Sequence, residues 1–154
     1  MTTRTVGDLV KGQDLLTAPE NTPVSDAARS MRGRRVGAML VVDGGKLVGI
    51  FTERDALFRV VAEKRDPATT PISAVMTANP TTIGTKDNFA AALHLMHEGR
   101  FRHVPVIDDD GQPVGIVSSR DAMGPELEDF MYTLILKGQR SEEHTSELQS
   151  RLHL

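Results

Sequence analysis

The chain has 154 residues, of which 39% are apolar and 25% are charged, as expected for a folded globular protein. Its net charge of −3 gives no overall basic character, so nucleic-acid binding is not expected. The lack of cysteine excludes a disulfide scaffold, a thiol nucleophile and cysteine metal sites. The sequence shows no apolar signal core and no run near the ~18 apolar residues of a membrane span, so we expect a cytoplasmic protein without a membrane partner.

The first set of predicted elements occupies residues 6–66. A short apolar–polar opening over 6–10 precedes a short strand over 15–18. Thr22-Pro23 predicts a helix start with proline in its first position, and Gly33 is expected to close this helix. Its apolar face is predicted at Val24, Ala27, Ala28 and Met31. A strand over 36–42, a turn over 43–46 and a returning strand over 47–51 then lead into a helix that runs to about Arg65.

The second set, over residues 72–124, follows a proline-containing linker and repeats the same order. It has a short strand over 81–83, a helix with apolar residues at 89, 92, 93 and 96, and two strands over 101–107 and 114–117 joined by a turn. A repeat of this length indicates a duplicated structural unit. Each unit would bury one face of its sheet, so we expect two units packed face to face around a single core.

Beyond the repeat, Pro125 predicts the start of another helix over 125–138, which ends at Gly138. Its apolar stripe must be buried, either on its own domain or on a second subunit, and we favour the second subunit because this helix lies outside the repeat. Residues 140–154 lack a matching apolar face and resemble the translation of a sequencing adapter. We expect a non-native tail there, the alternative being a genuine polar tail.

Both units contain the same strand-to-helix turn, Gly49-Ile-Phe-Thr-Glu-Arg-Asp55 and Gly115-Ile-Val-Ser-Ser-Arg-Asp121. Thr52 and Ser118 stand where a helix N-cap belongs, and an aspartate follows three residues later. One interpretation is a simple capping motif. The other is a ligand site, in which free backbone N–H groups of the helix N-terminus hold a phosphate and the carboxylate binds sugar hydroxyls.

Other candidate sites are weaker. His94 and His97 could share a metal ion, but Leu93 and Met96 define the buried face of that helix, so we expect the histidines to face solvent and predict no metal site. The three aspartates from Asp108 are better explained as a charged hairpin turn. The sequence contains no Walker A loop, no dinucleotide-binding glycine motif and no nucleophile elbow, so we do not expect an enzyme.

The assembled repeat resembles a tandem pair of CBS domains, the arrangement called a Bateman module. The matching segments are Ala27-Ala-x-x-Met31, Leu40-Val-Val-Asp43 and the first turn, and in the second unit Ala92-Leu-x-x-Met96, Val104-Pro-Val-Ile-Asp108 and the second turn. The resemblance implies an α+β fold of two β-α-β-β-α units paired as one pseudo-symmetric module that forms a homodimer. It also implies adenosine-type ligands, namely AMP, ADP, ATP or S-adenosylmethionine, and no required cofactor.

The resemblance further implies roles for individual residues. Asp55 and Asp121 would accept hydrogen bonds from ribose hydroxyls, and Thr52 and Ser118 would hold phosphate. The short strands would present backbone to the edge of the adenine ring, at Thr17, Ala18, Thr82 and Ile83. Apolar contacts to the face of the ring would come from Met39, Val104 and Pro105.

Basic residues distinguish the two units. Arg102 and His103 lead into the second unit's strand, where the family often has basic residues that contact phosphate groups. The first unit has Gly37 and Ala38 at this place. We therefore expect the second unit to contribute the better phosphate site. An ordinary solvated strand edge is the alternative explanation for Arg102 and His103.

These features favour a regulatory module that senses adenosine-type nucleotides in the cleft between the repeats and passes a conformational change to a partner protein that the sequence does not identify. The alternative is a ligand-independent structural or protein-interaction module. A third hypothesis, nucleic-acid binding through Arg32, Arg34 and Arg35, is less favoured because the whole chain is slightly acidic.

Overall fold

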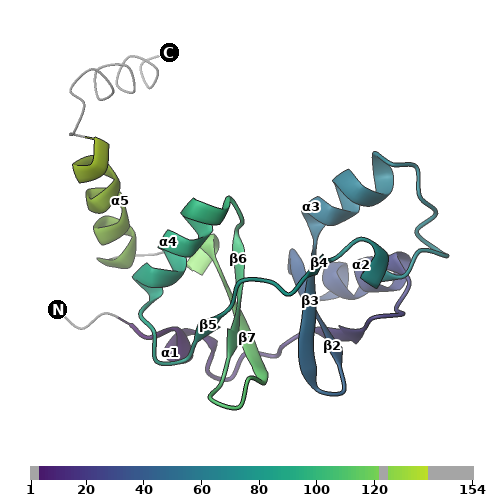
Figure 1. Ribbon diagram of the computed structural model, residues 1–154, viewed down its shortest axis with the longest axis horizontal. Coiled ribbons are helices and arrows are strands. Elements are labelled where there is room, and N and C mark those ends of the chain that lie inside the picture. Colours follow the sequence, from purple (N-terminus) through teal and green to yellow (C-terminus); the bar gives the residue numbers. More distant parts are fainter. Residues whose placement is uncertain (1–3, 122–124, 139–154) are drawn as a thin grey trace.

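The computed structural model describes residues 4–121 and 125–138 of the chain. These residues form two lobes that lie side by side, each with a small sheet and its own helices (Figure 1). Both lobes contain a strand, a helix and two further strands in the same order along the chain. The predicted α+β fold of two pseudo-symmetric units is therefore confirmed.

The first lobe contains a four-stranded sheet in the order β1-β2-β3-β4. Its strands are β1 (Thr17–Pro19), β2 (Ala38–Asp43), β3 (Lys46–Thr52) and β4 (Thr77–Ala78). β1 runs parallel to β2, whereas β2 and β3 form an antiparallel hairpin. Helix α2 (Val24–Arg34) connects β1 to β2 and buries Val24, Ala27 and Met31 of the predicted apolar face, while Ala28 is exposed.

The second lobe contains a three-stranded sheet in the order β5-β6-β7. Its elements are β5 (Ile83–Gly84), helix α4 (Phe89–Gly99), β6 (His103–Ile107) and β7 (Pro113–Ser118). As in the first lobe, the first pair of strands is parallel and the second is antiparallel. Even the register irregularity recurs, after Val41 in one sheet and after Val106 in the other.

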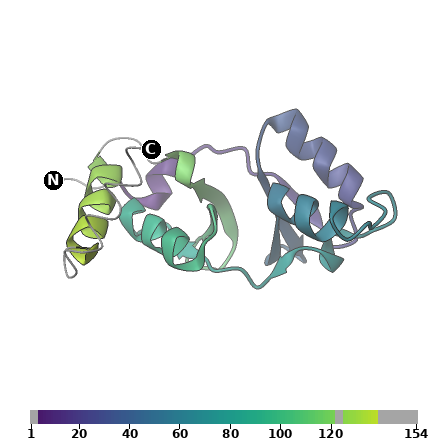
Figure 2. The ribbon, with the colours of Figure 1, turned by 90° about the horizontal axis from the view of Figure 1, so that it is seen from above.

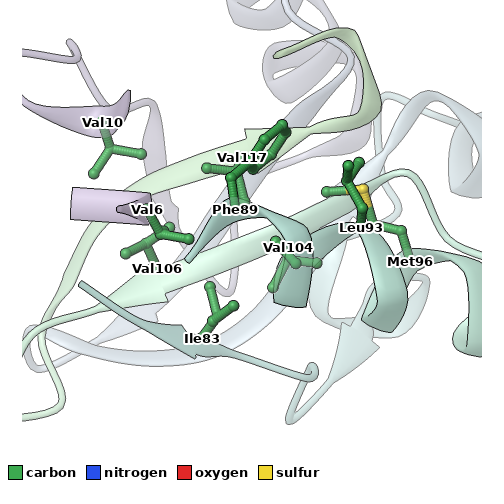
Figure 3. Packing of buried hydrophobic residues seen from close by; sticks show 10 residues of the cluster. Val6, Val10, Ile83, Phe89, Leu93, Met96, Val104, Val106 and Val117 are labelled. Atoms are coloured by element: carbon green, nitrogen blue, oxygen red, sulfur yellow. The ribbon is translucent and has the colours of Figure 1, made fainter. Parts of the chain in front are cut away.

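The opening segment of each repeat packs on the opposite lobe, and we call these two pieces the exchanged segments. Val6 and Val10 of helix α1 (Val6–Val10) lie in the core of the second lobe, beside Phe89, Val106 and Val117 (Figure 3). Conversely, the 3₁₀ turn Ile72–Ala74 contributes its buried isoleucine to the core of the first lobe, and β4 then pairs with β3. Two chain connections therefore run between the lobes (Figure 2).

Each lobe closes its own core, which differs from the expected single core. Met39, Val41 and Phe51 point into the first core, while Leu40 and Ile50 point to the other face of the same sheet. On that other face a smaller cluster joins the lobes and includes Ile116 of the second sheet. The sheets thus bury residues on both faces, because helices and exchanged segments cover one face and the other lobe covers part of the second.

Helices α2 and α4 end in the same backbone conformation. Arg35 and Arg100, the residues that follow them, adopt left-handed φ values of 55° and 57° and begin the approach to β2 and β6. The expected boundaries of the first helix are wrong in detail: Pro23 is the N-cap, and Gly33 lies inside the helix. The helix ends at Arg34, and Arg35 in the left-handed conformation caps it.

The helix after the first turn is not regular. Helix α3 (Glu53–Asp55) continues as a π-helix over Ala56–Val61, in which the Ala62 N–H donates to the Leu57 carbonyl at 2.9 Å. The Arg59 guanidinium within it donates to the carbonyls of Val75 and Met76 at 3.2 and 2.9 Å, which ties this helix to the exchanged segment.

The second turn continues as a 3₁₀ turn over Ser119–Asp121. Residues 122–124, including the rest of the expected short helix and the expected end of the second repeat, lie outside the described residues.

Helix α5 (Pro125–Gly138) packs on α4. The Phe130 ring of α5 lies edge-on to His94 and His97, with ring centroids 5.4 and 5.7 Å away. His97 is exposed, as expected, whereas His94 is half-buried. Met131 and Ile135 of the predicted stripe stay about half exposed. In the described residues no helix has the length and apolar character needed to cross a bilayer. The suspected non-native tail, 140–154, lies outside them.

Candidate functional site

Two clefts lie where the lobes meet, and the internal symmetry relates their walls. The first has a volume of about 1060 Å³ and places Thr52 and Asp55 of one lobe with Arg102 and His103 of the other. The second, of about 590 Å³, places Ser118 and Asp121 with residues 35–38 at the start of β2. Each cleft thus combines the turn of one repeat with the strand entrance of the other.

The first turn is a complete capping box. The Asp55 Oδ2 atom accepts hydrogen bonds from the Thr52 backbone N–H at 2.9 Å and from the Thr52 hydroxyl at 3.1 Å, while the hydroxyl accepts from the Asp55 N–H at 3.3 Å. The second carboxylate oxygen, Oδ1, lies 3.6 Å from Nε of Arg59. Asp55 is buried, with 8% of its surface exposed, so the carboxylate has a fixed position at the cleft wall.

The second turn repeats this geometry less tightly. The Ser118 N–H donates to Asp121 Oδ2 at 2.7 Å, and the Ser118 hydroxyl lies 3.5 Å from the same oxygen. Asp121 is partly exposed, whereas Asp55 is buried. Both carboxylates therefore line a cleft and both also cap their turn, so the capping and the ligand interpretations describe the same side chains.

Backbone N–H groups at the turns are less available to a phosphate than the sequence suggests. The Glu53 N–H donates to the Gly37 carbonyl at 3.0 Å, and the equivalent Ser119 N–H donates to the Arg102 carbonyl at 3.1 Å. The Asp55 N–H is bonded to the Thr52 hydroxyl. An anion in either cleft would therefore rely mainly on side chains, because these donors already have partners within the chain.

Cationic side chains dominate the first cleft. Its walls carry Arg54, Arg59, Arg100 and Arg102 against the two carboxylates of Glu53 and Asp55. The cleft also has an aromatic and apolar side: Leu57 and Phe58 line it while remaining about half exposed, and the Arg54 guanidinium lies over the Phe58 ring at 5.2 Å. A ligand with a flat apolar group and a negative charge matches this combination.

His103 lies between the two turns. Burial lowers the pKa of its imidazole, and the positive charges of Arg120 and Arg102 lower it further, while Glu53 and Asp121 oppose this shift. The imidazole is therefore mainly neutral at pH 7 in the free protein. A phosphate close to it would favour the protonated form, because an opposite charge stabilises the cation.

Met39 and Val104, which were expected to offer apolar side chains to adenine, are buried in the two cores. The backbone contacts expected at the two short strands stay a prediction, and the side chains of Ala18 and Ile83 there are buried. In the part of the chain that the structure describes, the cleft walls contain the preceding residues instead, Leu15 and Leu16 in the second cleft and Pro80 and Thr81 in the first. Thr17 and Thr82 directly follow these pairs in the chain.

Several lining residues were not selected from the sequence. Arg100 and Phe101 line the first cleft, and their counterparts Arg35 and Val36 line the second. The sequence signal that could have indicated them is the arginine that directly follows α2 and α4, at equivalent positions of the two repeats. Arg35 and Arg100 also share the left-handed backbone conformation.

The groups that meet in each cleft are hydroxyls, carboxylates and guanidinium groups, which can bind diols and anions. Over the described ranges 4–121 and 125–138, no cluster of three or more histidine or acidic side chains could hold a metal ion.

Comparison with known proteins is consistent with this arrangement. The family model of the CBS domain matches residues 6–62 and 72–124. CBS domain-containing protein CBSCBSPB3 of Arabidopsis thaliana is 43% identical over 102 residues, which is 66% of this chain and 18% of that protein. The chain spans less than a fifth of the length of the first curated relatives it matches.

Solved structures extend the likeness to the fold. CBS domain protein PAE2072 from Pyrobaculum aerophilum, complexed with AMP, has a TM-score of 0.74 and 25% identity, covering 83% of this chain and 98% of that one. The CBS domain pair of protein MJ0100, in complex with 5′-methylthioadenosine and S-adenosyl-L-methionine, has a TM-score of 0.64 and 30% identity, covering 70% and 87%. The chain therefore belongs to the CBS domain family and carries two CBS domains in tandem.

Proposed function

We propose that this chain is a regulatory module that binds adenosine-type nucleotides, namely AMP, ADP or ATP, in the clefts between its two CBS repeats. The observation that carries this proposal is the composition of the first cleft, in which Thr52 and Asp55 of one lobe face Arg102 and His103 of the other. A single ligand there would contact both repeats. We do not assign a reaction to these groups, which are suited to binding.

In this proposal the ribose diol donates hydrogen bonds to Asp55, mainly to Oδ1, because Oδ2 already caps the turn. The phosphate lies near the Thr52 hydroxyl, Arg102 and His103. The base occupies the apolar part of the cleft, near Pro80 and Thr81. The second cleft would use Asp121, Ser118 and Leu16 in the equivalent way.

The ligands of the two relatives support the adenosine class. PAE2072 is complexed with AMP, and the MJ0100 domain pair with 5′-methylthioadenosine and S-adenosyl-L-methionine. We favour a phosphorylated ligand for this chain because arginines outnumber carboxylates in the lining of both clefts. S-Adenosylmethionine is the second candidate. The cytoplasmic location stays a prediction of the sequence.

Signalling would follow from the bridging position of the ligand. A nucleotide that prefers one angle between the lobes shifts the population toward that angle, and a regulated protein, which we do not identify, would respond to it. We further propose a homodimer through exposed apolar helix faces, which comprise Leu57, Phe58, Val61, Met131, Tyr132, Ile135 and Leu136. A Val61→Glu substitution should then convert dimer to monomer in sedimentation experiments, whereas unchanged mass would contradict this interface.

A thermal melt with millimolar AMP, ADP, ATP or S-adenosylmethionine tests the proposal. A ligand that binds the folded state raises the melting midpoint by mass action. The control is the double variant Asp55→Asn/Asp121→Asn, which keeps an oxygen for each cap and should lose the ligand-induced shift. No shift with any ligand in the wild-type protein would contradict nucleotide sensing.

A ligand-independent interaction module remains the alternative, and one observation favours it. The hydrogen-bonding groups of both turns have partners within the chain. Each aspartate caps its own turn. The N–H groups of Glu53 and Ser119 donate to the Gly37 and Arg102 carbonyls, which precede the neighbouring strand of the same lobe. The architecture therefore needs no nucleotide to hold its shape. This alternative predicts a dimer that forms equally well with and without every nucleotide in the melt.

A further inference from the structure

Three residues, Glu53, Arg102 and His103, line both clefts. Glu53 belongs to the first turn, while Arg102 and His103 lead into β6 of the second lobe. These residues therefore form a common wall. A charged ligand bound against this wall in one cleft therefore also changes the electrostatic environment of the other cleft.

Backbone contacts hold the common wall in place. The Glu53 N–H donates to the Gly37 carbonyl, and its Oε1 atom lies 3.0 Å from the position that a Cβ at Gly37 would take, on the side of the second cleft. The Arg102 carbonyl accepts from Ser119 of the second turn, at 3.1 Å. His103 is acted on by charges from both turns, those of Glu53, Arg120 and Asp121.

We propose that the two clefts bind anionic nucleotides with negative coupling, because they compete for the same guanidinium of Arg102. This inference rests on the proposed nucleotide binding. A phosphate in the first cleft holds Arg102 on that side, and the second cleft then keeps Glu53 on the common wall with one guanidinium fewer to offset the carboxylates of its lining. By linkage, a phosphate in the second cleft weakens the first to the same degree.

The phosphate, and not the nucleoside, carries the coupling. Adenosine has the same base and ribose but no charge to draw Arg102 to one side. The second cleft should therefore accept adenosine equally well whether the first contains AMP or is empty. The protein would thus hold one nucleotide and one uncharged nucleoside more readily than two nucleotides.

Titration calorimetry with AMP and with adenosine tests this coupling. In the wild-type protein we expect AMP to bind in two steps, the second about tenfold or more weaker than the first. In Asp55→Asn, where the first cleft is impaired, AMP should bind the second cleft more tightly than in the second wild-type step. Adenosine should fill both clefts of the wild-type protein without this weakening.

Arg102→Gln provides the decisive variant and Arg120→Gln its control, because Arg120 lines only the second cleft. Arg102 is exposed, and an unchanged melting midpoint will verify that its variant folds. Arg102→Gln should bind AMP more weakly but in both clefts independently, whereas Arg120→Gln should keep the coupling. Two independent AMP sites in the wild-type protein, or coupling that persists in Arg102→Gln, would overturn the inference alone. No binding of AMP or adenosine would overturn the proposed function as well.

Discussion

The two turns have the same sequence pattern and the same capping bond, yet they sit in different surroundings. Asp55 is buried and its second oxygen lies near Arg59, while Asp121 is partly exposed at the edge of the smaller cleft. The difference arises outside the motif, from what packs on each turn. A repeated motif therefore predicts local geometry, whereas the strength of each site depends on tertiary partners that the motif does not contain.

The exchanged segments show a similar contrast. On the first lobe, β4 pairs with β3 through its backbone. On the second lobe, the side chain of Gln13 takes this place: its Nε2 donates to the Ile116 carbonyl at 3.1 Å and its Oε1 accepts from the Ile116 N–H at 2.7 Å. A side-chain amide thus substitutes for a strand, because it carries the same donor and acceptor as a peptide group.

The largest expected effect distinguishes the equivalent glycines Gly115 and Gly49. A Cβ at Gly115 would lie 2.5 Å from the Val10 Cβ atom, which helix α1 fixes in the core, whereas a Cβ at Gly49 would meet the flexible side chain of Met76. We expect Gly115→Ala to lower the free energy of unfolding by about 3 kcal/mol and Gly49→Ala by about 1 kcal/mol. Urea unfolding measures both, and equal losses would contradict the difference between the lobes.

The next effect compares the two aspartates. Asp55→Ala removes a cap and leaves the Thr52 N–H without its acceptor in a buried site, so we expect a loss of about 2 kcal/mol in the free energy of unfolding. Asp121→Ala should cost about 1 kcal/mol, because water can replace its carboxylate. Thermal and urea unfolding of the two variants without ligand would contradict this order if Asp121→Ala proved the more damaging.

A smaller effect is expected at Gln13. Gln13→Ala removes both hydrogen bonds to Ile116 at an exposed site, where water can take over, so we expect a loss of about 1 kcal/mol. Gln13→Glu keeps the acceptor but not the donor and should fall between the wild type and Gln13→Ala. Hydrogen exchange at the Ile116 amide provides a local readout, and unchanged protection in Gln13→Ala would rule out this role.

The smallest effect concerns pH. Because burial lowers the pKa of His103 in the folded state, the unfolded state binds more protons below about pH 6.5, and the free energy of unfolding should fall as pH decreases through this range. His103→Gln should show a shallower decrease between pH 7.5 and 5. Identical pH profiles for the variant and the wild type would show that this imidazole does not titrate as described.

Local features of the fold could be predicted from the sequence. The spacing of Val24, Ala27 and Met31 specified the buried face of α2, and Thr52 and Asp55 specified a capped turn. These features depend on residues within one turn of each other. The π-helix after Asp55 could not be predicted in this way, because the contacts of its Arg59 lie on the distant segment at Val75 and Met76.

The assembly of the clefts also lay beyond sequence reasoning. Arg102 and His103 were assigned to the site of Asp121, yet they line both clefts, and the larger one contains Asp55. Met39 and Val104 were assigned to adenine but lie in the cores. Periodicity identifies which residues are apolar, but the choice between a core and a cleft depends on which lobe covers which face of each sheet.

A crystal structure grown with AMP tests the central claim most directly. The account predicts nucleotide in the first cleft, with its ribose hydroxyls at Asp55 and its phosphate at Arg102, so that one molecule contacts both lobes. Both clefts without nucleotide at saturating AMP, or a nucleotide that contacts one lobe only, would contradict it.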